Sequence, residues 1–314
     1  MKLKLLVMIF VLGINSVYSQ TNILRDTLIN NNSFDSLENT HKSLSELKFQ
    51  TKFEPYDYKI STPIILGLSA AALGTGIAVY LYEYNAWWKD KRSTKFRVID
   101  DWEYALWIDK IGHLYATTMI AHGLSSAFDA ANFPPEKNAI YSSLGALLFQ
   151  TYIEIEDGYG AQWGFSPGDF YADVLGAGYH LAKYYYPVVK NFQPRVSYYP
   201  SKKYLNGEHK DGNIIDDYEG QKYWLSLRMK ELLPKDIAKY WPSFLMLSVG
   251  MGVSDLDGRG GGNRELYISF DLDWQTLPIP GKIGQLVKNT LNYFHLPMPG
   301  VKISPKTTFL VFCY

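Results

Sequence analysis

The sequence predicts an α+β protein, with a membrane-associated four-helix core followed by a small antiparallel β region. Three observations support this fold class. Long apolar stretches with helix start and stop signals fill residues 61–190, whereas apolar and polar residues alternate in short runs after residue 191. The chain has 314 residues, of which 47% are hydrophobic and 20% are charged, so it can bury a sizeable core.

A secretion signal opens the chain. Lys2 and Lys4 precede a short apolar run, and Val17-Tyr18-Ser19 forms a small-x-small cleavage site before Gln20. Residues 1–19 are therefore predicted to be a signal peptide. The alternative is a membrane anchor. An anchor requires an apolar run long enough to span roughly 30 Å of hydrocarbon, and the run at residues 5–12 is too short for that.

The amino-acid composition indicates where the protein is located and which classes of partner it binds. The 31 Lys and Arg residues balance the 31 Asp and Glu residues, which argues against a nucleic-acid-binding protein, because such a protein needs a basic face. The single cysteine, Cys313, excludes an intrachain disulfide and leaves no cysteine for N-terminal lipidation. We therefore expect a protein of the bacterial cell envelope, in the periplasm or associated with the outer membrane, with membrane lipid or envelope proteins as partners.

The beginning of the mature chain divides into two parts. Residues 20–60 are polar and are expected to form a flexible N-terminal segment. Residues 63–82 carry no charge and have the length of a transmembrane helix, and Trp87, Trp88 and Lys89 follow as an interfacial belt would. The alternative is a helix buried in the core of a soluble bundle.

Three more helices complete the predicted helical domain, residues 61–190. They are expected at about 102–131, 138–157 and 166–186. Pro134-Pro135 and Gly158 end the first two, and Ser166 caps the third.

The remaining residues, 191–314, are predicted to be β-rich after a polar connector at 191–221. Alternating runs predict strands at 223–229, 245–253, 265–274 and 309–314, and residues 283–294 have the spacing of a short amphipathic helix. The two middle runs flank a turn with the sequence SDLDGRGGGN and should form a hairpin. These strands are too few for a membrane barrel, which needs about eight.

Polar residues on the apolar helices form the candidate site. Asp109 and His113 are four residues apart and share one helical face, Glu154 lies near the end of the next helix, and Asp169 and Asp173 recur on the last. A buried acid is costly unless it is paired, so the three helices are expected to bring these residues together.

Three interpretations stay open. A carboxylate could orient His113 as a general base, with His113, Asp109, Glu154 and Asp173 as catalytic candidates. A divalent metal could be held by His113, Glu154, Asp169 and Asp173. The same groups could instead satisfy one another as a buried polar lock, with Lys110 as the counter-ion.

The ordered motifs DKIGH at 109–113, EIEDG at 154–158 and GFSPGDFYADVLGAG at 164–178 resemble the YfiM-like family of predicted periplasmic lipoproteins, a domain of unknown function. They are more distantly similar to the VanZ-like membrane proteins. The resemblance covers about residues 100–190 and implies an envelope location, a helical membrane-associated core and no established reaction. The matching positions are Asp109, Lys110, His113, Glu154, Asp157, Ser166, Asp169, Asp173 and Gly176.

The function expected from the sequence is that of an envelope protein with a structural or assembly role. The alternative is a metal-dependent or acid–base enzyme that acts on a lipid or a cell-wall intermediate. No sequence motif indicates a cofactor, because the chain has no P-loop, dinucleotide fingerprint, HExxH or GxSxG sequence.

Overall fold

The computed structural model describes residues 59–89, 92–208, 214–258 and 260–314. The predicted signal peptide and nearly all of the predicted flexible segment 20–60 lie outside these residues. The described part combines helices with one antiparallel sheet, so the predicted α+β class is confirmed.

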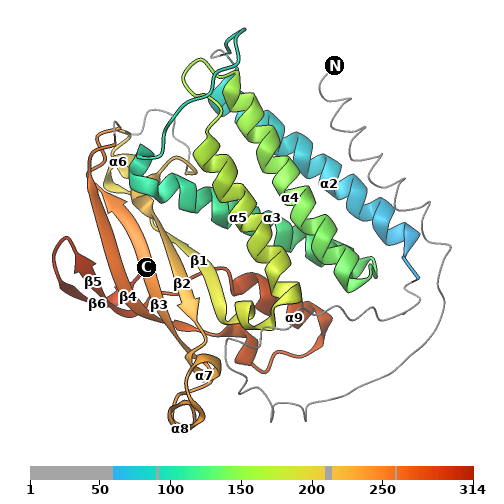
Figure 1. Ribbon diagram of the computed structural model, residues 1–314, viewed down its shortest axis with the longest axis vertical. Helices are drawn as coiled ribbons and strands as arrows, with labels where there is room; N and C mark the ends of the chain where they lie inside the picture. The colour runs from blue at the N-terminus through green and yellow to red at the C-terminus, as the bar shows by residue number, and fades with distance from the viewer. Residues whose placement is uncertain (1–58, 90–91, 209–213, 259) are drawn as a thin grey trace.

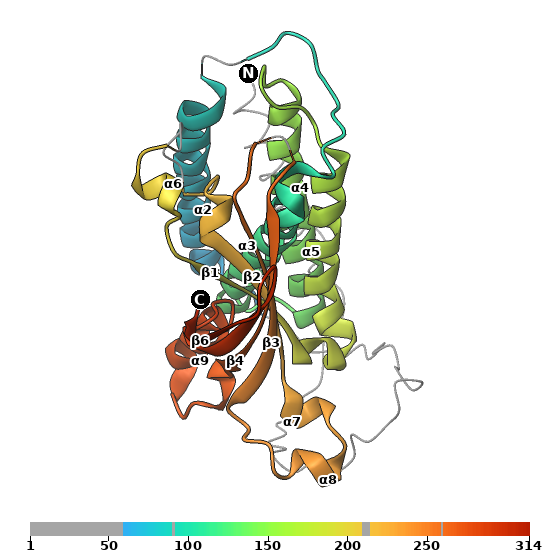
Figure 2. The same ribbon diagram turned by 90° about the vertical axis from the view of Figure 1, so that its left-hand side faces the viewer.

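The four predicted helices are present. They are α2 (Thr62–Glu83), α3 (Ile108–Ala130), α4 (Pro135–Gly158) and α5 (Pro167–Tyr185). Helices α3, α4 and α5 pack against one another, and α2 contacts α3. Figure 2 shows α3 between α2 on one side and α4 and α5 on the other. None of the described side chains of α2 is buried, so the packed core belongs to α3–α5.

Local signals explain where the helices begin. Pro167 occupies the first turn of α5, and the Ser166 hydroxyl accepts a hydrogen bond from the Asp169 amide at 3.1 Å, as the sequence predicts. Helix α3 begins at Ile108 rather than near 102. The residues before it form a short 3-10 turn, η4 (Tyr104–Trp107), whose last three residues have left-handed backbone angles and so interrupt the helix.

The sheet has six antiparallel strands in chain order, β1-β2-β3-β4-β5-β6. The strands are β1 (Phe192–Tyr198), β2 (Gln221–Leu227), β3 (Leu245–Ser254), β4 (Asn263–Leu272), β5 (Met298–Ser304) and β6 (Thr308–Cys313). The predicted hairpin is confirmed, since β3 and β4 pair over their whole length. The predicted connector 191–221 is wrong at its start, because β1 lies there, and β5 was not predicted. Pro194, Pro299 and Gly300 interrupt the strand pattern in these two segments.

The sheet curls so that its last strand returns toward its first. Cys313 of β6 packs with Trp224 of β2 and Tyr267 of β4, and the Tyr314 ring lies 5.0 Å from the ring of Tyr199, just after β1. The outer edge of β1 is covered by the segment around Phe294: the Val196 amide donates to the Tyr293 carbonyl at 3.0 Å, and the Val196 carbonyl accepts from the His295 amide at 2.9 Å.

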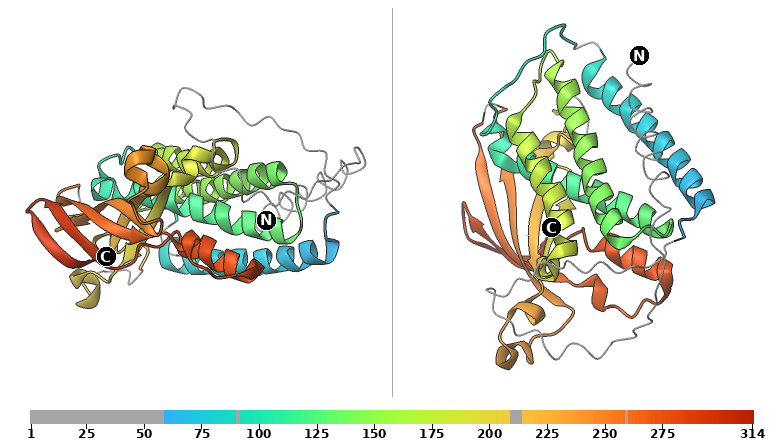
Figure 3. Two further views of the ribbon diagram at one scale, coloured as in Figure 1. Left: turned by 90° about the horizontal axis from the view of Figure 1, so that it is seen from below. Right: turned by 45° about the vertical axis from the view of Figure 1, so that its right-hand side comes forward.

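Helices α3–α5 and the sheet lie side by side. In Figure 1 these helices occupy one side of the molecule, next to β1 and β2, and leave β4, β5 and β6 uncovered. Helix α3 contacts β1, β2 and β3. The predicted amphipathic helix is α9 (Gly281–Leu291), which lies on the same side of the molecule as α2 (Figure 3). The short helices of the β region are α6 (Lys202–Leu205), α7 (Met229–Leu232) and α8 (Lys235–Ala238).

Candidate functional site

Three helices deliver the candidate residues to one place. His113 is on α3, Glu154 on α4, and Asp169 and Asp173 on α5. Helices α3 and α5 come close because residue 176 is glycine: a Cβ atom there would lie 2.4 Å from the Leu114 carbonyl oxygen, well inside contact distance. This close approach sets His113 opposite Asp173.

The imidazole of His113 is the centre of the cluster. Its Nδ1 lies 3.2 Å from Asp173 Oδ1. Its Nε2 lies 3.8 Å from Glu154 Oε1 and 3.9 Å from Asp169 Oδ1. The structure therefore brings together all four residues that the sequence proposes as metal ligands.

Further bonds hold the carboxylates in place. Asp173 Oδ1 accepts hydrogen bonds from the Thr117 hydroxyl at 2.8 Å and from the Gln150 amide at 3.2 Å. Glu154 Oε2 accepts from the Ser166 backbone amide at 3.0 Å. Thr117 of α3 and Gln150 of α4 thus fix Asp173 of α5, and Ser166, the residue before α5, fixes Glu154 of α4.

Lys110 is the counter-ion of the cluster, as predicted. Its ammonium lies 2.7 Å from Asp101 Oδ2, 3.0 Å from Asp109 Oδ2 and 3.0 Å from Asp169 Oδ1. Asp109 thus joins the cluster mainly through Lys110. Asp101 was not predicted to take part, because it lies in the loop before α3, away from the helical pattern.

The β region also contributes a residue. The Tyr218 hydroxyl donates a 2.7 Å hydrogen bond to Asp109 Oδ1. Tyr218 lies in the 3-10 turn η6 (Tyr218–Gly220) that precedes β2. No sequence pattern predicted this contact, because Tyr218 and Asp109 are more than one hundred residues apart.

The charges of the cluster do not balance when every group is ionised. Five carboxylates, those of Asp101, Asp109, Glu154, Asp169 and Asp173, face the two cationic groups of Lys110 and His113. Uncompensated buried charge is costly, so some of these groups must change their protonation.

The pKa shifts indicate which of these groups change their protonation. Burial raises the pKa of Glu154 to about 8, although His113 opposes the rise. Burial and the Asp109 carboxylate raise the pKa of Asp169 to about 7. Burial lowers the pKa of His113, but its hydrogen bond to Asp173 and the nearby acids outweigh burial and raise it to about 10. A protonated imidazole therefore sits among acids, two of which take up a proton near neutral pH.

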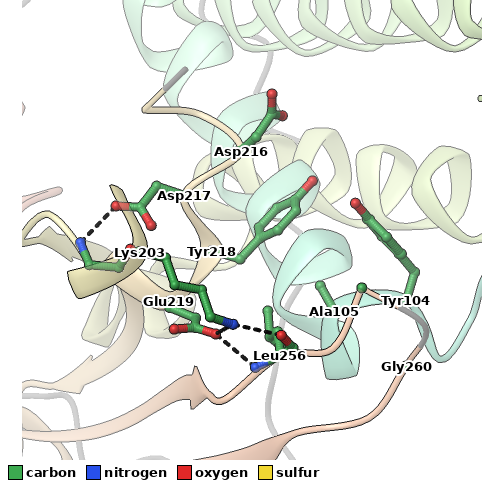
Figure 4. A pocket seen from close by; sticks show the side chains of 11 residues that line it. Tyr104, Ala105, Lys203, Asp216, Asp217, Tyr218, Glu219, Leu256 and Gly260 are labelled. Carbon is green, nitrogen blue, oxygen red and sulfur yellow. Dashed lines mark hydrogen bonds and ion pairs between the residues drawn. The ribbon is translucent and has the colours of Figure 1, made fainter. Parts of the chain in front are cut away.

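The cluster is closed rather than open. The side chains of Glu154 and Asp173 are 2% and 0% exposed, and His113 keeps 21% of its side chain exposed. A cavity of about 210 Å³ lies nearby, and none of the four metal-ligand candidates lines it. Figure 4 shows this cavity between Tyr104, Tyr218 and the acidic residues Asp216, Asp217 and Glu219, with Lys203 bound to Glu219 and to the Leu256 carbonyl.

Two overlapping groups could hold a metal ion. They are Asp109, His113 and Asp169, and His113, Glu154 and Asp173, and in each group the ligand atoms lie within 4.8 Å of one another. Within the described part of the chain, the buried Asp173 Oδ2 has no hydrogen-bond partner, which leaves it as an acceptor for a cation. The Lys110 ammonium already lies beside Asp109 and Asp169, however, so the second group fits an ion better than the first.

Other singled-out residues have separate roles. Asp157 lies apart from the cluster's bonds and accepts a 2.7 Å hydrogen bond from the Trp88 indole. His295 bonds to Asp271, which also pairs with Arg195 at 2.9 Å in a second buried polar cluster on the sheet. Asp257 accepts from the Gly261 amide within the β3–β4 turn, in line with a plain turn.

Comparison with known proteins shows a match between part of the chain and one family model. Residues 99–185 match the family model described as "Predicted periplasmic lipoprotein (DUF2279)". This stretch contains α3, α4 and α5 and all the candidate site residues. No curated protein and no solved structure matches the chain. Through residues 99–185 the chain matches a periplasmic lipoprotein domain of unknown function, and the protein is an exported protein of the cell envelope.

Proposed function

We propose that this protein is a membrane-attached structural or assembly component of the envelope, in which the charged cluster locks the helical domain together. The observation that carries the proposal is the closure of the cluster. Glu154, Asp169 and Asp173 are buried, and they are bonded to other protein groups instead of lining the cavity. An active site needs a path for its substrate, whereas a lock does not.

The bonding pattern suits a lock, since each helix is tied to another. His113 of α3 binds Asp173 of α5, and Gln150 of α4 donates to the same carboxylate. Lys110 of α3 reaches Asp169 of α5. Removing one member leaves a buried group without its partner, so the three helices keep one arrangement.

Membrane attachment is proposed for α2. Residues Thr62–Tyr82 are long and apolar enough to cross a bilayer, and none of the described side chains in this stretch is buried within the protein. Ile64, Leu66, Ile77 and Leu81 are exposed along it. In water these side chains would remain hydrated, and a lipid environment removes that cost. The partners proposed are therefore membrane lipid and other envelope proteins.

A second candidate function is a metal-dependent or acid–base enzyme that acts on a lipid or cell-wall intermediate. It is favoured by the part of His113 that stays exposed and by Glu154 and Asp169, whose pKa values near neutral suit proton transfer. If a divalent ion binds, His113, Glu154 and Asp173 would hold it and would supply one nitrogen and two carboxylate ligands.

One experiment separates the lock from a metal site. The full chain is purified from the envelope fraction, its metal content is measured, and its melting temperature is recorded with a chelator and with added Mn²⁺ or Zn²⁺. A lock predicts no stoichiometric metal and an unchanged melting temperature. Stoichiometric metal that is lost in His113→Ala, together with a melting temperature that falls with the chelator, would replace the lock by the metal site.

A further inference from the structure

The six-stranded sheet has the reverse of the polarity expected for a sheet in a water-soluble protein. Strand pairing aligns one apolar row across the whole sheet: Pro194, Leu225, Val249, Ile268, Val301 and Phe309. The next row, on the opposite face, is Gln193, Ser226, Ser248, Ser269, Gly300 and Leu310. Side chains alternate between faces along a strand, so one face is apolar and the other is largely polar.

The polar face is the buried one. Ser226 and Ser248 are completely buried and bond to each other at 2.7 Å. Beside them Asp271 binds Arg195 at 2.9 Å and His295 at 2.7 Å, again in full burial. The curl of the sheet, which brings Cys313 back to Trp224, encloses this face.

The apolar face is the exposed one. Leu225, Val249 and Ile268 keep 44%, 48% and 40% of their surface, and Phe309 keeps 83%. Helix α3 covers part of this face through Ile108, which packs with Val253, Met251 and Tyr223. The rest of the face remains free of helices over β4, β5 and β6 (Figure 1). An apolar surface of this extent marks contact with a membrane or a partner.

The segment between β2 and β3 supplies a rim to this face. It contains α7 and α8, which extend past the end of the strands (Figure 2). Ile237, Tyr240 and Phe244 are exposed there, and the Lys239 ammonium lies 4.9 Å from the Tyr240 ring. Lys235 and Lys239 are also exposed, as are Glu231 and Asp236, so the three lysines of residues 229–240 exceed the two acids by one charge. Exposed aromatic residues next to lysines suit the headgroup region, where the cations complement anionic lipids.

We propose that the apolar face of the sheet is seated in one leaflet of an envelope membrane, with lipid acyl chains as its occupant and the α7–α8 segment at the headgroups. The size of the face suits one leaflet. Leu266, Ile268 and Phe270 alternate along β4, so they cover about 14 Å at ~3.4 Å per residue. That is about half of the roughly 30 Å hydrocarbon core of a bilayer. This contact is separate from α2 and does not depend on it.

The test places a fluorescent label on the face. Ile268→Cys and Phe309→Cys are made in the full chain and labelled with bimane, with Asp129→Cys, an exposed position at the end of α3, as the matched control. Labelled parent protein gives the background from the buried Cys313. Each protein is mixed with vesicles of phosphatidylethanolamine and phosphatidylglycerol that carry brominated acyl chains.

The proposal expects the labels at 268 and 309 to lose most of their emission to the brominated chains, while the label at 129 keeps its emission. If the protein floats with the vesicles but the labels at 268 and 309 are not quenched, the proposal is overturned. Attachment through α2 would remain compatible with that result. Labels at 268 and 309 that are shielded from water in the absence of vesicles would also overturn the proposal. If the protein then sediments as a dimer, a second copy covers the face; if it sediments as a monomer, a segment of the same chain covers it.

Discussion

The Tyr218 hydroxyl and the Asp109 carboxylate are joined by a 2.7 Å hydrogen bond across 109 positions of sequence. Asp109 also contacts Lys110, whose ammonium reaches Asp101 and Asp169. Tyr218 lies in the turn that leads into β2. The sheet and the helical domain therefore share one polar network.

Removing this hydroxyl should weaken the whole protein. Tyr218→Phe leaves Asp109 buried with one acceptor unpaired, and we expect the free energy of unfolding to fall by about 1–3 kcal/mol. Tyr240→Phe is the matched control, because Tyr240 is exposed. Chemical denaturation measures both variants, and equal stability of the two would show that the bond does not connect the regions energetically.

A double-mutant cycle tests the centre of the cluster. His113→Ala and Asp173→Asn each leave a buried partner unsatisfied, and we expect each to cost about 3–5 kcal/mol. The double variant should be less damaging than the sum by about 0.5–3 kcal/mol, since the second change removes a group that the first had already left unpaired. Additive costs would remove both the lock and the catalytic interpretation of this pair.

Two glycines of α5 should respond in opposite directions. Gly176→Ala would place a Cβ atom 2.4 Å from the Leu114 carbonyl oxygen and 2.9 Å from Thr117 Cβ. Helices α3 and α5 would then separate, at a cost of about 1–3 kcal/mol. At Gly178 nothing lies within 4 Å, so Gly178→Ala should stabilise the helix by about 0.5–1 kcal/mol. Thermal unfolding compares the pair, and similar effects at both positions would contradict the close helix contact.

His180 should make stability depend on pH. Burial, with smaller contributions from Lys183 and His122, lowers the pKa of His180 to about 3. The unfolded chain has a histidine pKa near 6.5. Between these values the unfolded state binds the extra proton. The contribution of His180 is therefore fully present above about pH 6.5 and is lost as pH falls toward 3.

The variant His180→Gln isolates that contribution. Its unfolding free energy should fall less steeply than that of the parent between about pH 6.5 and 4, with a difference in slope of up to about 1.4 kcal/mol per pH unit. Glu154 and Asp169, whose raised pKa values favour the folded state as pH falls, are present in both proteins. Parallel curves for the two proteins would mean that His180 has the same pKa in the folded and the unfolded state.

Helix α2 can be tested by one charge. Gly74→Arg places a cation near the middle of Thr62–Tyr82 and should oppose membrane insertion by roughly 2.5–3.5 kcal/mol. Thr94→Arg, at an exposed position, is the control for added charge. Extraction with carbonate should release the Gly74→Arg protein and should retain the control. Release of the parent protein itself would exclude insertion of α2.

The sequence predicted the helical part of the fold well because its signals are local. Pro134-Pro135, Gly158 and Ser166 mark helix ends through their own backbone properties, and the structure begins or ends helices beside each of them. Strands β1 and β5 were missed because their prolines break the alternating pattern. Pro194 is tolerated since it lies in the outermost strand, where one edge of the chain has no partner strand in the sheet.

The candidate site was predictable only in part for a similar reason. Spacing on single helices identified His113, Glu154 and Asp173, and the cost of burying acids indicated that they would meet. Asp101 and Tyr218 come from a loop and a turn, where no periodicity constrains the side chain. The Arg195–Asp271–His295 group was also missed: the sequence pattern alone does not say which face of a curled sheet is enclosed.

The two edges of the sheet are unequal. The segment around Phe294 covers the edge of β1 through the backbone bonds of Val196, whereas among the described residues β6 pairs with β5 alone. Among the described residues, the edge backbone groups without a partner strand or segment therefore lie along β6, whereas Val196 of β1 is bonded. Two copies that pair through β6 would form a closed two-fold dimer, in which each copy consumes the open edge of the other. Growth into a fibre requires two open edges on every copy, so the covered edge of β1 ends such growth at two molecules.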